Sequence, residues 1–100
     1  SISDNRSGGW YSYRASKAGL NMIIKNLSIE LRRSNKNLIV TGLHPGTVES
    51  NLSQPFQKSI ENSKIFSPDY SVSKLSSVID NLSVSDSGKC YAWDGVEIFP

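Results

Sequence analysis

The chain has 100 residues, of which 37% are hydrophobic, and a net charge of +2, so it can form one small domain. Its basic residues are scattered and no apolar run reaches the roughly 18 residues of a membrane span, so neither a nucleic-acid partner nor a membrane partner is expected. The single cysteine, Cys90, excludes an internal disulfide and a paired-cysteine metal site, which favours a reducing, cytoplasmic setting.

The first predicted element is a long helix over residues 11–34. It follows a polar segment, residues 1–10, whose Gly8-Gly9 pair favours a loop. Three stripes with helical spacing run along it: a face with Tyr13, Lys17, Leu20, Ile24, Leu27 and Leu31; an opposite apolar strip with Tyr11, Ala15, Ala18, Met22 and Ile29; and a polar stripe with Arg14, Asn21, Lys25, Ser28 and Arg32. A helix with two apolar sides is expected to be buried on both.

A strand buried on both faces is predicted over residues 38–43, an apolar run rich in β-branched residues. His44-Pro45-Gly46 ends this run. Residues 47–66 lack a sustained period and are expected to form a long functional loop that is mobile without ligand, as lids are.

A second helix is predicted to begin at Ser67 as N-cap, with Pro68 in the first helical position. Over residues 70–82 the pattern places four apolar side chains on one face: Val72, Leu75, Ile79 and Leu82. Residues 90–93 and 96–99 then flank the turn dipeptide Asp94-Gly95. The alternation of helices and strands predicts an α/β fold with a parallel sheet.

Tyr13 and Lys17 are the candidate chemical pair. Four residues apart on a helix, their side chains lie on the same face. An ammonium group beside a phenol favours the phenolate, which can exchange a proton with an alcohol or carbonyl oxygen. On the spacing alone, an ordinary, partly exposed helix pair is the better interpretation, so the surrounding sequence must decide.

That surrounding sequence resembles the short-chain dehydrogenase/reductase family. Residues 13–18 match its YxASKA signature, residues 45–50 its PGxVxT segment, and Asp94-Gly95 its C-terminal end. Residues 8–14 and 43–46 look most like the C-factor and sniffer-like carbonyl reductase branch. The resemblance implies that residues 1–100 are the C-terminal catalytic half of one Rossmann-type three-layer sandwich. The family's glycine-rich phosphate-binding turn is not found here, so the N-terminal cofactor-binding half is expected to be absent.

The resemblance also implies roles for individual residues. Tyr13 takes the position of the family's acid/base, and Lys17 that of the lysine that assists its ionisation and holds the nicotinamide ribose. Ser1, twelve residues before Tyr13, is the first candidate for the serine that fixes the substrate carbonyl, and Ser3 is a weaker one.

The cofactor would be contacted by the segment that follows the strand. The family's pattern assigns this contact to the backbone at Pro45, Gly46 and Val48, and to Ser50, where the family has threonine. The resemblance favours NADP over NAD.

The implied function is that of an oxidoreductase acting on a small-molecule carbonyl or alcohol. Epimerases and dehydratases of the same superfamily are a second reading, disfavoured because the sequence after Gly95 is too short for their substrate domain. An inactive fragment or a signalling and interaction module is a third. The 100 residues alone are expected to be inactive and to bind no cofactor, whereas the intact enzyme is expected to form a homodimer through helix 11–34.

Overall fold

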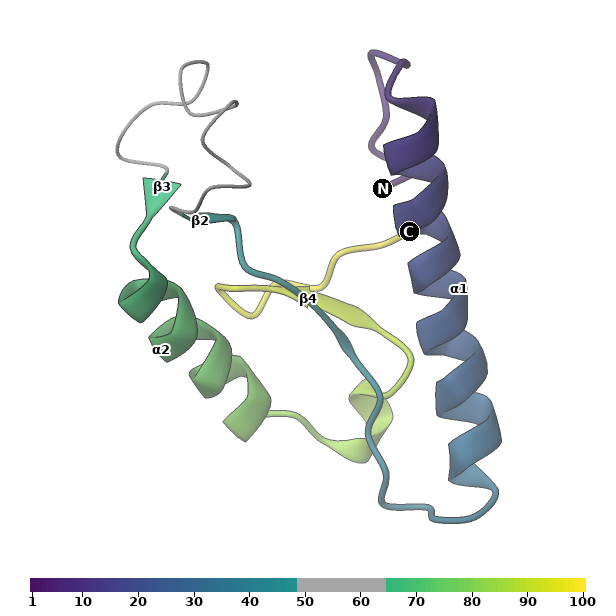
Figure 1. Cartoon of the computed structure of the whole chain (residues 1–100). Helices are drawn as coiled ribbons and strands as arrows, with labels where there is room; N and C mark the ends of the chain where they lie inside the picture. The colour runs from purple at the N-terminus through teal and green to yellow at the C-terminus, as the bar shows by residue number, and fades with distance from the viewer. Residues whose placement is uncertain (49–64) are drawn as a thin grey trace.

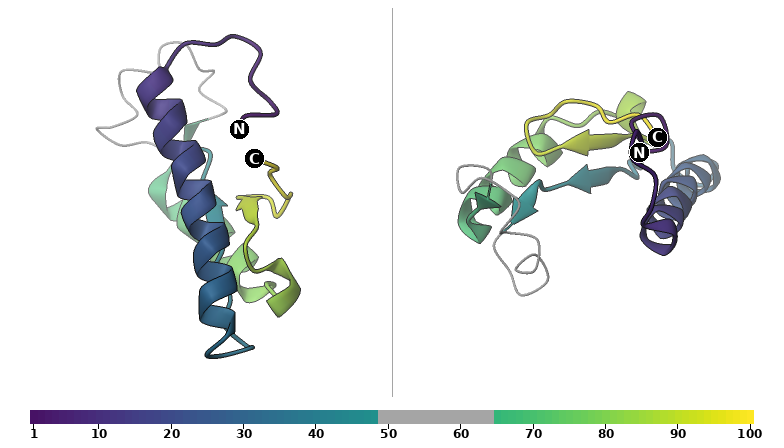
Figure 2. Two further views of the ribbon diagram at one scale, coloured as in Figure 1. Left: turned by 90° about the vertical axis from the view of Figure 1, so that its right-hand side faces the viewer. Right: turned by 90° about the horizontal axis from the view of Figure 1, so that it is seen from above.

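The computed structural model describes residues 1–48 and 65–100. Two helices lie on opposite faces of a small parallel sheet, which gives three layers (Figures 1 and 2). The elements, in chain order, are α1 (Tyr11–Arg32), β1 (Gly42–His44), β2 (Thr47–Val48), β3 (Ile65–Phe66), α2 (Pro68–Asp80), the 3-10 turn η3 (Val84–Asp86) and β4 (Cys90–Ala92). In the part of the chain that the structure describes, no helix is long and apolar enough to cross a membrane.

The sheet is parallel, as predicted. β1 pairs with β4, Leu43 lying opposite Tyr91. A second parallel pair joins β2 to β3, with Val48 opposite Phe66. The two ends of the predicted loop 47–66 are therefore short strands, which the sequence pattern did not indicate. The mobility expected for residues 49–64 concerns residues outside those described.

β1 begins later than the predicted strand over 38–43. The pairing of β1 with β4 starts where Gly42 lies opposite Cys90, the first residue of β4. Before that point the chain is held by the turn that precedes β4: Gly88 N donates to Val40 O over 2.7 Å, and Val40 N donates to the Ser87 hydroxyl over 3.0 Å.

The buried side of α1 differs from the prediction. The least exposed positions follow one line along the helix: Arg14, Ala18, Asn21, Ile24 and Ser28. This line contains much of the predicted polar stripe. A Cβ placed on Gly42 would meet Ile24 Cδ1 at 2.8 Å, and one placed on Gly88 would meet Ser28 Oγ at 2.7 Å. The helix therefore lies closest to the strand and to the turn before β4 at two glycines, which have no side chain to hold it away.

Most of both predicted apolar strips of α1 is exposed in this structure, contrary to the expectation of burial on two sides. Leu20 is 45% exposed, Met22 62% and Ile29 46%. Ile24 of the first strip and Ala18 of the second lie on the less exposed line, and the remaining members of both strips are exposed in the described part of the chain.

α2 begins as predicted, but its buried face is displaced from the predicted one. The Ser67 hydroxyl caps the helix by accepting from Tyr70 N over 3.2 Å. Ser71 and Val78 are the buried residues of the helix, whereas Val72 is 63% exposed. The side chains of α2 that face inward therefore include Ser71 rather than Val72. The small serine side chain allows the helix to approach the sheet.

The C-terminal segment forms the predicted hairpin around Asp94-Gly95. Gly95 N donates to Ala92 O, and Ala92 N donates to Val96 O, each over 2.9 Å. Cys90 is half-buried beside Gly42, and burial raises the pKa of its thiol. The Cys90 side chain thus packs between the strands and α1 rather than facing solvent.

Candidate active site

The first turns of α1 bring Tyr13 and Lys17 together. Lys17 Nζ lies 5.7 Å from the centroid of the Tyr13 ring. Tyr13 is 59% exposed, and the Trp10 ring packs edge-on against it, with centroids 6.1 Å apart. The phenol and the ammonium group are thus adjacent and open to a ligand.

Arg14 secures the loop from which α1 starts. Its guanidinium donates from Nε to Gly9 O over 2.9 Å and from Nη2 to the Ser7 hydroxyl over 3.3 Å. The backbone turns into the helix at Trp10, which has a φ of +56° and accepts from Arg14 N over 2.8 Å. The sequence pattern placed Arg14 on a polar stripe and did not indicate this contact with the preceding loop.

Ser1 is not joined to this pair by any hydrogen bond in the described part of the structure. Its hydroxyl accepts from Asp4 N over 3.1 Å and lies 3.4 Å from the Ser3 hydroxyl. Ser3 N in turn donates to Pro100 O over 3.4 Å, which places the two ends of the chain close together (Figure 2). Ser1 and Ser3 therefore share a loop next to the C-terminus.

The segment after β1 makes a tight turn. Gly46 has a φ of +75°, and its N–H donates to His44 Nδ1 over 2.9 Å. Through this hydrogen bond, the His44 side chain supports the turn that ends the strand. Pro45 and Gly46 are half-buried, and Val48 follows in β2, while Ser50 lies outside the described residues. The turn and the start of α1 face the same end of the molecule, the end at which β1 finishes (Figure 1).

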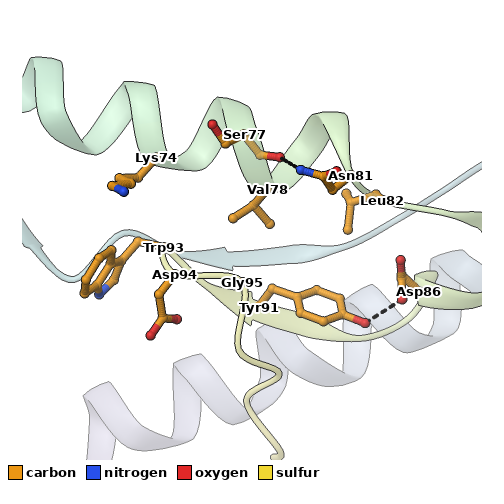
Figure 3. A pocket seen from close by; sticks show the side chains of 10 residues that line it. All are labelled: Lys74, Ser77, Val78, Asn81, Leu82, Asp86, Tyr91, Trp93, Asp94 and Gly95. Atoms are coloured by element: carbon orange, nitrogen blue, oxygen red, sulfur yellow. Dashed lines mark hydrogen bonds between the residues drawn. The ribbon is translucent and has the colours of Figure 1, made fainter.

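A cavity of about 420 Å³ lies on the other side of the sheet, between α2 and the C-terminal hairpin (Figure 3). Its polar groups are engaged within the chain. Tyr91 Oη donates to Asp86 Oδ1 over 2.7 Å, which raises the pKa of Tyr91 to about 12. A hydrogen bond from the Ser83 backbone, followed by that from Tyr91, lowers the pKa of Asp86. This cavity is separate from Tyr13 and Lys17.

Comparison with known proteins gives a consistent result. No family model matches the chain. C-signal from Myxococcus xanthus is 35% identical over 98 residues, which are 98% of this chain and 54% of that protein. The NADPH-bound carbonyl reductase from chicken fatty liver superimposes with a TM-score of 0.77 at 33% identity, covering 92% of this chain and 34% of that one. The carbonyl reductase Sniffer of D. melanogaster superimposes with a TM-score of 0.80 at 28% identity, covering 98% and 36%.

The chain thus spans about half the length of the curated relative C-signal and about a third of each of the two reductases. Within that span, the likeness extends over nearly all of the chain. The parallel sheet between two helices is part of the reductases' Rossmann fold, as expected from the sequence. The likeness in sequence to C-signal and in fold to the two carbonyl reductases supports the short-chain dehydrogenase/reductase resemblance indicated by the sequence, on the carbonyl-reductase-like side of that family.

Proposed function

We propose that the native protein is an oxidoreductase that interconverts a small-molecule carbonyl compound and its alcohol with a nicotinamide cofactor. The observation that carries this proposal is the exposed Tyr13–Lys17 pair, whose ammonium nitrogen lies 5.7 Å from the phenol ring. The pair stands at the end of the molecule where β1 finishes, and ligands of open α/β sheets bind at the carboxyl ends of the strands (Figure 1).

In this proposal Tyr13 moves the proton. In the reducing direction its hydroxyl donates a proton to the substrate oxygen, and in the oxidising direction its phenolate accepts one. Lys17, whose ammonium nitrogen lies 5.7 Å from the centroid of the Tyr13 ring, is proposed to stabilise the negative charge that develops during this transfer. Ser1 is proposed to hold the substrate oxygen. In this structure the hydroxyl of Ser1 is exposed and bonded within the 1–4 loop, so the proposed role requires that loop to move.

The proposed cofactor is NADP, with NAD as the alternative. NADPH is the ligand named for the chicken carbonyl reductase, to which this chain is similar over 92% of its length. A bound nicotinamide supplies the hydride chemistry. Lys17 would hold its ribose, and the turn at Pro45, Gly46 and Val48, with Ser50 beyond it, would contact the nicotinamide. The turn is suited to this contact at Gly46. The side-chain direction of Gly46 is filled by the rings of Phe66 and Trp93, and glycine places no side chain between the turn and a bound nicotinamide.

We propose further that residues 1–100 form the C-terminal catalytic half of one domain and that the native protein is a cytoplasmic homodimer. The proposed contact between subunits is the strip of α1 that carries Ala15, Ala18 and Met22. Small residues allow two helices to approach closely, and Met22 is 62% exposed, so the strip offers apolar surface to a partner.

The test is reduction of a panel of aldehydes and ketones by the native protein, followed as consumption of NADPH. The proposal predicts consumption that depends on the carbonyl compound and falls sharply in Lys17→Met. Lys25→Met is the matched control, because Lys25 lies two turns further along α1. Absence of carbonyl-dependent consumption by the wild type across the panel would exclude the function.

A further inference from the structure

Three aromatic side chains from separate elements meet beside the turn that follows β1. They are Phe66 of β3, Tyr70 of α2 and Trp93 of the C-terminal hairpin. Phe66 packs edge-on against Trp93 with centroids 4.7 Å apart, and it packs against Tyr70 with centroids 4.9 Å apart. Tyr70 and Trp93 are 6.2 Å apart. We call these three residues the aromatic cluster.

Two rings of the aromatic cluster close directly on Gly46. A Cβ placed on this glycine would lie 2.6 Å from Phe66 Cε2 and 3.3 Å from Trp93 Cδ1. Atoms at 2.6 Å would overlap, so the rings occupy the space that any side chain at position 46 would need. The φ of +75° independently favours glycine here. The backbone of the turn therefore rests against the faces and edges of these rings.

Backbone pairing and a hydrogen bond also stabilise the same turn. Val48 pairs with Phe66 in the parallel β2–β3 ladder, so Phe66 supports the turn through both its main chain and its ring. His44 Nδ1 accepts from Gly46 N on the preceding side. Through Tyr70 and Trp93, these contacts connect the turn to α2 and to the C-terminal hairpin. Neither of those elements carries a residue of the proposed active site.

We propose that Phe66 and Trp93 are positioning residues that set the location of the Pro45–Gly46 turn and thereby the affinity for the nicotinamide cofactor. The effect on affinity rests on the proposed function, whereas the effect on the turn does not. Tyr70 belongs to the same cluster, but the three atoms nearest the Gly46 Cβ position all come from Phe66 and Trp93. Tyr70 therefore serves as a control that shares the packing without the closest contact.

The experiment compares Phe66→Leu with Tyr70→Leu in the native protein. Three quantities are measured: the melting temperature, the backbone N–H residual dipolar coupling of Gly46 without cofactor, which reports the orientation of the turn, and the dissociation constant of NADPH by fluorescence titration. We expect similar losses of melting temperature. Phe66→Leu alone should change the Gly46 coupling and weaken NADPH binding by roughly tenfold, because a binding group is displaced. If Phe66→Leu does not fold, Trp93→Leu takes its place.

Equal effects of the two variants on the Gly46 coupling and on NADPH affinity would overturn the proposal, because the cluster would then act only as general packing. An unchanged Gly46 coupling in Phe66→Leu would overturn it as well. If the wild-type protein binds no NADPH, the proposed function fails, and the Gly46 coupling alone decides whether the two rings position the turn.

Discussion

Replacing Val78 by alanine tests which face of α2 is buried. Val78 is 9% exposed and Val72, on the same helix, is 63% exposed. The substitution removes the equivalent of two CH₂ groups, about 1.6 kcal/mol when fully buried. Multiplied by the buried fraction of each side chain, the hydrophobic stabilisation lost is about 1.5 kcal/mol at position 78 and about 0.6 kcal/mol at position 72. Alanine also favours a helix over valine by about 0.6 kcal/mol, and this gain is common to both variants.

Val72→Ala is therefore expected to leave the free energy of unfolding nearly unchanged. Val78→Ala should lower it by about 0.9 kcal/mol, and by more if the packing around the missing methyl groups does not relax. The assay is urea unfolding of the native protein, followed by circular dichroism at equal protein concentrations. A cost at position 72 equal to or larger than that at position 78 would refute the reasoning, because the sequence pattern places Val72 on the inward face.

Three further predictions follow from individual contacts. The Asp86–Tyr91 hydrogen bond should stabilise the fold between an acid and an alkaline limit. Folding lowers the pKa of Asp86, so the stabilisation is lost as pH falls below about 4. Folding raises the pKa of Tyr91, so the stabilisation is also lost as pH rises from about 10 to 12. Tyr91→Phe should flatten the alkaline limb of a pH–stability curve, and an unchanged limb would contradict this. The Thr41 hydroxyl is buried without a hydrogen-bond partner among the described residues, so Thr41→Val should raise the free energy of unfolding by about 1 kcal/mol in the same urea assay. Met22→Glu should convert the proposed homodimer to monomer in analytical ultracentrifugation, whereas Glu30→Gln should not.

The order of elements could be predicted from the sequence because each has a strong local signal. Ser67-Pro68 marks the start of α2, and Asp94-Gly95 marks the hairpin, both as observed. The parallel pairing of β1 with β4 followed from the alternation of helix and strand. The short β2–β3 pair could not be predicted, since two residues are too few for a periodic pattern.

Which faces are buried was predicted less well. The pattern of α1 favours its large apolar residues for the interior, and Ile24 does lie against Gly42, but the second close contact joins Ser28, of the predicted polar stripe, to Gly88. Such close approach depends on a glycine in the facing segment, and the sequence does not show which glycine will meet which helix position. In α2, likewise, the sequence does not show that the small residue Ser71 will be buried.

The candidate site was predicted in part. Tyr13 and Lys17 meet because helical spacing alone ensures it. The support of the site by Arg14 and by the aromatic cluster depends on contacts between residues distant in sequence, such as Gly46 with Phe66 and Trp93, which no local pattern reveals.

The central claim is that Tyr13 transfers the proton, and the most direct test is the turnover of Tyr13→Phe in the native protein. Tyr11→Phe is the matched control, because Tyr11 is 86% exposed in the same first turns of α1. We predict that Tyr13→Phe lowers kcat by roughly 10²–10⁴-fold, the usual contribution of a general acid–base, while the dissociation constant of NADPH stays near the wild-type value. Wild-type turnover in Tyr13→Phe, or lost NADPH affinity with unimpaired chemistry, would contradict the account.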